Sequence, residues 1–254
     1  MFKQKLGYLL IWLVVLGAIA LYSFVDPITQ DSSYHHFADQ RNLYSIANYY
    51  NVISNLAFLV VGFYGSYIFL FRLKLGYKFA EKRAYQIFYI GVFLVAFGSA
   101  YYHLEPSNLT LVWDRLPMTI SFMALFSMVI GEYLSSKVGQ ALLLPLIVCG
   151  GISVFYWWFG EIQGHGDLRL YVLVQFVPLI LIPIILIFFA KESVQSRGYW
   201  MLILAYVLAK FLEYFDASIY QELHFISGHS LKHIVAAIGT YWLLKYQIVQ
   251  HPKK

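Results

Sequence analysis

Long runs of apolar residues dominate the chain and restrict its possible folds more than any other feature. Hydrophobic residues make up 60% of the sequence and charged residues 12%, compared with about 25% charged residues in an ordinary soluble domain. A helix needs roughly 20 apolar residues to cross the hydrocarbon core of a bilayer. Stretches of this kind lie at about residues 6–25, 50–71, 85–103, 115–134, 140–159, 169–190, 199–215 and 229–248.

These runs predict an all-α integral membrane protein. The strands of a membrane β-barrel would instead show short segments in which apolar and polar residues alternate. We expect an N-terminal transmembrane helix in residues 1–25, a non-cytoplasmic loop in residues 26–49 and a seven-helix bundle in residues 50–254. The basic start and Ala18-Ile19-Ala20 are also typical of a signal peptide, but the apolar run continues to Val25, which favours a retained helix.

The charged residues predict how these helices are oriented. Thirteen Lys and Arg residues lie in the termini and in alternate loops, whereas only Arg41, Arg115 and Arg169 lie in the intervening loops, beside several acidic residues. Because cytoplasmic loops carry an excess of Lys and Arg, both termini are expected on the cytoplasmic side. The net charge of +5 therefore reflects membrane topology and does not indicate a nucleic-acid partner.

Polar residues recur where the predicted spans reach the non-cytoplasmic side. His103 follows Ser99 by four residues, so both side chains lie on one face of a helix. His229 and His233 have the same spacing, which lets two imidazoles reach one metal ion. Asp114 opens a span that begins on the same side. The predicted topology therefore brings the three helix ends that carry these residues to one depth in the bilayer, with Ser99 about 6 Å deeper.

Three imidazoles with one open position are typical of a catalytic zinc, which lowers the pKa of a bound water to about 7. Asp114 is then a candidate general base, and Ser99 is a candidate hydrogen-bond donor to an oxyanion. Each residue alone also has a structural explanation, because Asp114 occupies an expected helix N-cap and a histidine in an apolar span is commonly a hydrogen-bonded core residue. We favour the metal site because several costly groups converge there. The single Cys149 excludes a cysteine-based site.

A charged face on the seventh predicted span is interpreted as structural. Lys210, Glu213 and Asp216 recur every three residues, so they lie on one side of a helix. Lys232 on the last span is expected to pair with Glu213 or Asp216. Such ion pairs would hold the two spans together inside the bilayer.

A stripe of amides on the second predicted span is also interpreted as structural. Asn48, Asn51 and Asn55 share one helix face. Hydrogen bonds between helices are a sufficient explanation for this stripe.

The motifs are similar to those of the alkaline ceramidases, including bacterial alkaline phytoceramidase-like proteins, in the CREST superfamily of membrane hydrolases. The similarity spans most of the chain and rests on Asn51-Val52-Ile53-Ser54-Asn55, Gly98-Ser99 with His103, Trp113-Asp114-Arg115-Leu116-Pro117-Met118, and His229 with His233. It implies a seven-transmembrane-helix CREST-type bundle, here preceded by one additional N-terminal transmembrane helix. It also implies zinc on the three histidines and hydrolysis of ceramide-like membrane lipids to a fatty acid and a sphingoid base. The resemblance places the protein in a bacterial inner membrane.

The sequence departs from the family pattern at two places. Arg115 stands where the family has Glu, which leaves the exact lipid open. Some members bind calcium through acidic residues before the first core helix, whereas here Asp39, Asn42 and Asn48 are accompanied by Arg41. Calcium prefers six to eight oxygen ligands, so zinc is the expected cofactor and calcium is weakly supported.

Two other functions fit parts of the pattern. A receptor or scaffold of the same superfamily would use zinc to tie helices together without turnover, because a shared fold does not imply a shared reaction. A retinal-type photoreceptor would use Lys232 or Lys210 as a Schiff base, but it leaves the histidines unexplained. The hydrolase is the leading hypothesis.

Overall fold

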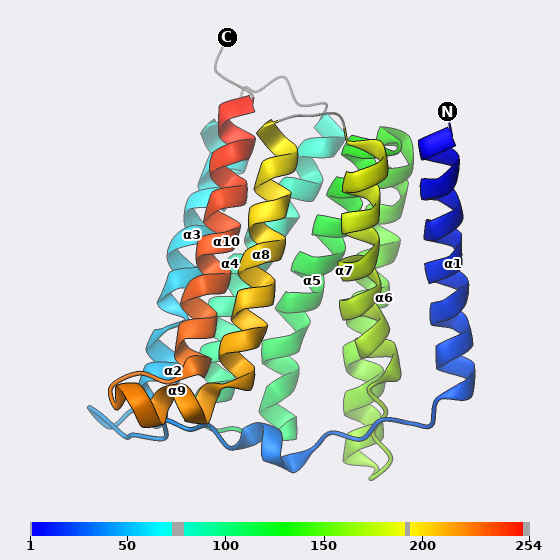
Figure 1. Cartoon of the computed structure of the whole chain (residues 1–254). Coiled ribbons are helices and arrows are strands. Elements are labelled where there is room, and N and C mark those ends of the chain that lie inside the picture. Colours follow the sequence, from blue (N-terminus) through cyan, green and yellow to red (C-terminus); the bar gives the residue numbers. More distant parts are fainter. Residues whose placement is uncertain (1, 73–78, 191–193, 251–254) are drawn as a thin grey trace.

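The computed structural model describes residues 2–72, 79–190 and 194–250. Within these ranges the regular structure is helical apart from an isolated bridge between Leu43 and Ile46. The long helices stand side by side in a bundle (Figure 1). They are α1 Phe2–Phe24, α3 Leu56–Tyr67, α4 Phe79–Leu104, α5 Asn108–Tyr133, α6 Ser136–Ile162, α7 Arg169–Phe189, α8 Val194–Tyr214 and α10 Gly228–Gln250. Shorter helical segments are η1 Ser32–His35, α2 Tyr49–Ile53, η2 Ile68–Arg72 and α9 Asp216–Leu223.

The helical membrane class predicted from the sequence is confirmed. Six segments of the described chain are long and apolar enough to cross a bilayer, and one of them is the composite segment Tyr49–Phe71. Helices α8 and α10 have 21 and 23 residues and run alongside the others (Figure 1). They are not among the six, so the count of eight spans stays a prediction.

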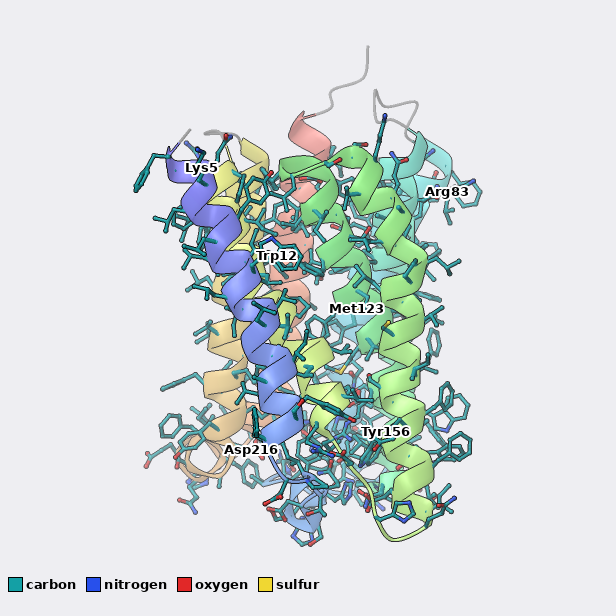
Figure 2. The ribbon with its side chains drawn as sticks, turned by 90° about the vertical axis from the view of Figure 1, so that its right-hand side faces the viewer. Lys5, Trp12, Arg83, Met123, Tyr156 and Asp216 are labelled. Carbon is teal, nitrogen blue, oxygen red and sulfur yellow. The ribbon has the colours of Figure 1, made fainter. Side chains whose placement is uncertain are left out.

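Helix α1 packs against α7 and presents most of its side chains to the outside of the bundle. Trp12 projects outward (Figure 2) and is 63% exposed, and Leu9 and Leu16 are also exposed. An apolar surface of this extent is unfavourable in water and is expected to face lipid. Helix α1 therefore forms part of the lipid-facing surface.

The second predicted span is interrupted. Helix α2 ends at Ile53 and α3 begins at Leu56. Between them, the Ser54 hydroxyl donates a hydrogen bond to the Asn51 carbonyl at 3.0 Å, and the Asn55 amide donates to the same carbonyl at 2.8 Å. Side chains that bond to nearby backbone in this way compete with helical hydrogen bonds. This competition explains why one continuous helix is not formed.

The predicted interhelical role of the asparagines is confirmed for two of the three. Asn48 Nδ2 donates to the His103 carbonyl at 2.8 Å. Asn51 Oδ1 accepts a hydrogen bond from the Ser230 hydroxyl at 2.8 Å. Asn55 instead bonds to the backbone of its own segment. The first two bonds fix the segment around α2 against α4 and α10.

Helix α5 begins earlier than predicted. Its N-cap is Ser107, whose hydroxyl accepts a hydrogen bond from Thr110 N at 3.2 Å, while Thr110 Oγ1 accepts from Ser107 N at 3.1 Å. This reciprocal capping box satisfies two helix-end donors. Asp114 therefore lies in the second turn of the helix, and its interpretation as an N-cap is wrong. Asp114 is a partly buried helical residue without a capping role.

Gly98 brings α4 and α5 into close contact. Pro117 has no backbone N–H, so it cannot donate to the Trp113 carbonyl four residues earlier in α5. Gly98 faces that carbonyl, and a Cβ atom at this position would overlap the carbonyl oxygen. Small residues allow membrane helices to approach in this way. The contact holds the helix that carries Ser99 beside the helix that carries Asp114.

Replacing Gly98 with Ala is expected to destabilise the bundle by about 1–3 kcal/mol, because overpacking forces α4 and α5 apart. Thermal unfolding of the purified protein in detergent would measure the fall in Tm. Gly17→Ala on α1 is the matched control, since a Cβ there meets nothing within 4 Å. Equal Tm values for the two variants would contradict the proposed close contact.

Candidate metal centre

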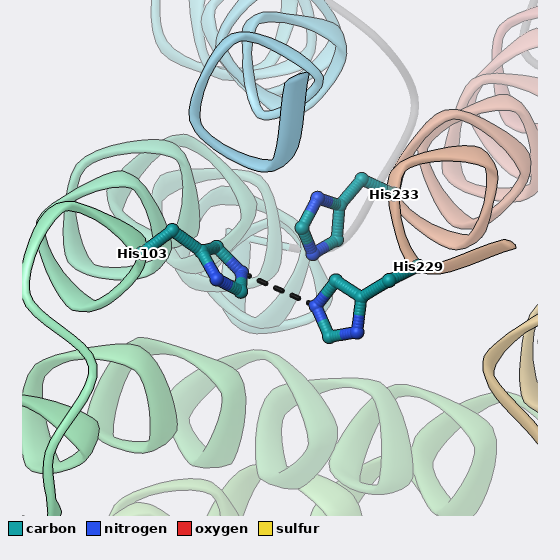
Figure 3. Close-up of side chains that lie close together, drawn as sticks. All are labelled: His103, His229 and His233. Atoms are coloured by element: carbon teal, nitrogen blue, oxygen red, sulfur yellow. Dashed lines mark hydrogen bonds between the residues drawn. The ribbon is translucent and has the colours of Figure 1, made fainter. Parts of the chain in front are cut away.

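Three buried histidines meet near the ends of α4 and α10. His103 comes from the last turn of α4, and His229 and His233 come from the first turns of α10 (Figure 3). Each is at most 6% exposed. One nitrogen of each ring lies within 4.8 Å of the others, which makes the cluster able to hold a metal ion. The sequence predicts that His103 lies close to His229 and His233, and the structure confirms this proximity.

One donor distance in the cluster matches that of a tetrahedral zinc site. Zn–N bonds of 2.0–2.1 Å in a tetrahedral site place two nitrogen ligands about 3.3–3.4 Å apart. His103 Nε2 and His229 Nε2 are 3.3 Å apart. His233 Nδ1 is 2.8 Å from the Ser54 hydroxyl, which leaves its Nε2 available to a metal ion. A hydrogen bond to the second ring nitrogen orients a metal-ligating histidine. Ser54 is therefore placed to orient His233, a contact that the sequence reasoning missed.

Asp216 fixes the start of α10. Its carboxylate accepts hydrogen bonds from His229 N at 2.7 Å and from Ala38 N at 2.9 Å. An acidic group is favourable at a helix N-terminus. The expectation that Asp216 belongs to the charged face of the preceding span is wrong, because α8 ends at Tyr214 and Asp216 begins α9. Asp216 instead holds His229 at a fixed height in the bundle.

The predicted ion pairs between α8 and α10 are confirmed for Glu213. Its carboxylate accepts hydrogen bonds from Lys210 at 2.6 Å and from Lys232 at 2.7 Å. Lys232 Nζ also lies 3.2 Å from His229 Nε2. This imidazole nitrogen has one lone pair, which cannot serve both a metal ion and an ammonium donor. Metal binding at this nitrogen therefore requires Lys232 to donate elsewhere, and the Glu213 carboxylate already accepts from it.

Phe37 covers the histidine cluster. Its ring centroid is 4.7 Å from those of His103 and His229, and its side chain is 5% exposed. The segment that carries Phe37 crosses one end of the bundle between α1 and α2 (Figure 1). His35 fixes this segment through contacts with Tyr102 at 2.9 Å and Asn108 at 2.7 Å. The sequence reasoning missed Phe37, although an aromatic residue within a polar loop was a signal for it.

A cavity of about 470 Å³ begins at the cluster. Ser99, Asp114 and His233 all line it, so the two candidate catalytic residues and one of the histidines share a common cavity. The rest of its lining is largely apolar and includes Val92 and Ile182. Cavities of this size and polarity are typical of binding sites for small or chain-like ligands. The arrangement can hold an apolar chain with its polar group at the histidines.

The residues considered for calcium are differently engaged. The Asp39 carboxylate accepts hydrogen bonds from Arg41 at 2.6 and 2.9 Å. Asn48 turns its amide nitrogen to the backbone of α4. The Asp39 carboxylate, which a calcium ion would need as a ligand, is therefore already paired with Arg41.

Comparison with known families gives one match. The Ceramidase family model matches residues 39–252. No curated protein matches the sequence. The matched range contains the three histidines, Ser99 and Asp114, and it excludes α1 and the segment with Phe37.

Proposed function

Because the chain belongs to the Ceramidase family, we propose that it is a zinc-dependent membrane hydrolase that cleaves the amide bond of N-acyl sphingoid lipids. The observation that carries this proposal is the cluster of three buried histidines at the polar end of an apolar cavity. Such a cavity accommodates a lipid chain, and the cluster supplies a ligand set suited to a hydrolytic metal.

Each site residue has a role in this proposal. His103, His229 and His233 would hold zinc, which when bound supplies Lewis-acid activation of water and of the amide carbonyl. Asp114 accepts a proton from the attacking water and passes it to the leaving nitrogen. Ser99 donates a hydrogen bond to the carbonyl oxygen as negative charge develops on it. A C–O bond forms as the C–N bond breaks, giving a fatty acid and a sphingoid base.

The cavity also supports lateral access from the bilayer. Both α7 and α8 contribute to its lining, and α8 packs mainly against α10. We expect the substrate to pass between α7 and α8, with its acyl chain in the apolar part of the cavity. This route avoids transfer of the chain through water, which is costly for each buried CH₂ group.

The charge distribution supports an active site near the non-cytoplasmic face. Lys5 and Arg83 lie at one end of the bundle, and Asp216 lies near the other (Figure 2). Since basic residues mark the cytoplasmic side, we propose that both termini are cytoplasmic. In a bacterial inner membrane the histidine cluster would then lie near the periplasmic face.

Metal analysis combined with a hydrolysis assay tests the proposed function. We expect about one zinc per purified chain, as in three-histidine catalytic sites, and release of fatty acid from N-acyl sphingoid lipids. Removal of the metal with a chelator should abolish hydrolysis, and zinc should restore it. Restoration by calcium alone, or hydrolysis without bound metal, would refute the proposal. Zinc without turnover would favour the receptor or scaffold alternative.

A further inference from the structure

Arg115 is a buried cation beside the cavity. Its side chain lies on α5, and the residue is 5% exposed. The guanidinium carbon is 4.3 Å from the ring centroid of Trp157 and 4.7 Å from that of Tyr171. Cation–π contacts of this kind contribute about 2 kcal/mol or more when desolvated. They offset only part of the several kcal/mol that burial of an ion costs.

The hydrogen bonding of this guanidinium is incomplete. Arg115 Nη2 donates to Gln30 Oε1 at 2.5 Å, whereas Nη1 is buried without a hydrogen-bond partner. Within the described ranges, no carboxylate lies within 4.0 Å of it, in contrast to Arg169, which is paired with Asp167 at 2.8 Å. A buried charge with an unmatched donor is strongly unfavourable. The site therefore lacks an acceptor group.

None of the three carboxylates that line the same cavity pairs with Arg115. Two of them bind other groups, and the third points in a different direction from the helix. Asp31 accepts a hydrogen bond from Ser33 N at 2.8 Å, and this bond lowers the pKa of the Asp31 carboxyl group. Glu213 is held by two lysines. Asp114 is the preceding residue on the helix, so its side chain departs about 100° away around the axis. Arg115 itself lines the cavity, so a group bound there is placed to supply an acceptor to the guanidinium.

We propose that Arg115 binds an anionic oxygen group, either a phosphate or a carboxylate, on the headgroup of the N-acylated lipid in the cavity. This inference rests on the proposed function and narrows its substrate class to acidic N-acyl lipids. Arg115, His233 and Asp114 line one cavity, so a single lipid can reach all three. A planar guanidinium matches two oxygens of such a group in a bidentate arrangement.

Substrate preference tests the inference. Three substrates that carry the same acyl chain should be compared: a neutral N-acyl sphingoid lipid, its phosphate ester and an N-acyl amino acid. The wild type should cleave at least one acidic substrate about tenfold faster in kcat/KM than the neutral one, and Arg115→Gln should lose about 10- to 100-fold on that substrate, as for a charged hydrogen bond. The loss on the neutral substrate should be smaller than the loss on the acidic one by about fivefold or more. The two acidic substrates distinguish phosphate from carboxylate recognition.

Two controls keep the outcome clear. Arg169→Gln removes a partly exposed arginine outside the cavity lining and should leave the substrate preference unchanged.

Binding of dodecyl phosphate should raise the Tm of the wild type more than dodecanol does, and Arg115→Gln should lose this difference. Equal cleavage of neutral and acidic substrates, with equal Tm shifts, would overturn the inference and leave the hydrolase intact. An Arg115-dependent Tm shift without any hydrolysis would instead refute the proposed function and support the anion site.

Discussion

Replacing His103 with Ala is expected to remove bound zinc and to lower the rate of hydrolysis by about a thousandfold or more. The metal contributes several kcal/mol to such reactions, and 1.36 kcal/mol corresponds to a tenfold change in rate. His103 is the ligand that α4 supplies, while His229 and His233 both come from α10. Without it, two imidazoles on one helix remain. Elemental analysis and fatty-acid release from the same preparation would measure both effects.

The matched control for this variant is His165→Ala. His165 is exposed in the loop after α6, away from the cluster, so its replacement should leave zinc content and rate unchanged. Alanine at His229 or His233 should reproduce the loss seen at His103. Full zinc content together with the wild-type rate in any of the three cluster variants would exclude the proposed ligand set.

Replacing Asp114 with Asn is expected to lower kcat by about 10²- to 10⁴-fold, the usual contribution of a positioned general base. The amide has nearly the shape of the carboxylate but cannot accept the proton from water. Asp114 does not belong to the group of side chains that could hold the metal. The zinc content of the variant should therefore remain at the wild-type level. Steady-state kinetics with parallel metal analysis would separate this effect from loss of the metal.

Asp26→Asn is the control for Asp114→Asn. Asp26 is exposed in the segment after α1, and its replacement should affect neither kcat nor zinc content. If Asp114→Asn kept the wild-type rate with full zinc content, Asp114 would not be the base. If neither the variant nor the wild type hydrolysed lipid, the receptor or scaffold alternative would gain support.

The segment before residue 39 contributes two side chains to the site from outside the part of the chain that matches the family. It lies outside the range matched by the Ceramidase model, yet Phe37 covers the histidines and Gln30 bonds to Arg115. The segment therefore covers one side of the site. Because it contacts both the cluster and the cavity, it is well placed to influence which headgroups the cavity accepts.

Much of the candidate site was predictable from the sequence because its signals are local. Apolar runs of sufficient length identify membrane helices. The four-residue spacings of Ser99 with His103 and of His229 with His233 place each pair on one helix face. The alternation of basic loops then assigns the ends of different helices to one side of the bilayer. Together these local rules were enough to predict that His103 and the α10 pair would meet.

Contacts between distant segments were decided only by the tertiary structure. Asp216 binds the start of α10, and Phe37 packs on two histidines. No helical periodicity relates these residues to the sites they serve. Arg115 illustrates the same limit: the sequence places it on a helix, but its aromatic neighbours and its unmatched donor depend on how α5, α6 and α7 pack. Periodicity determines which face of a helix a residue occupies, whereas packing determines what that face meets.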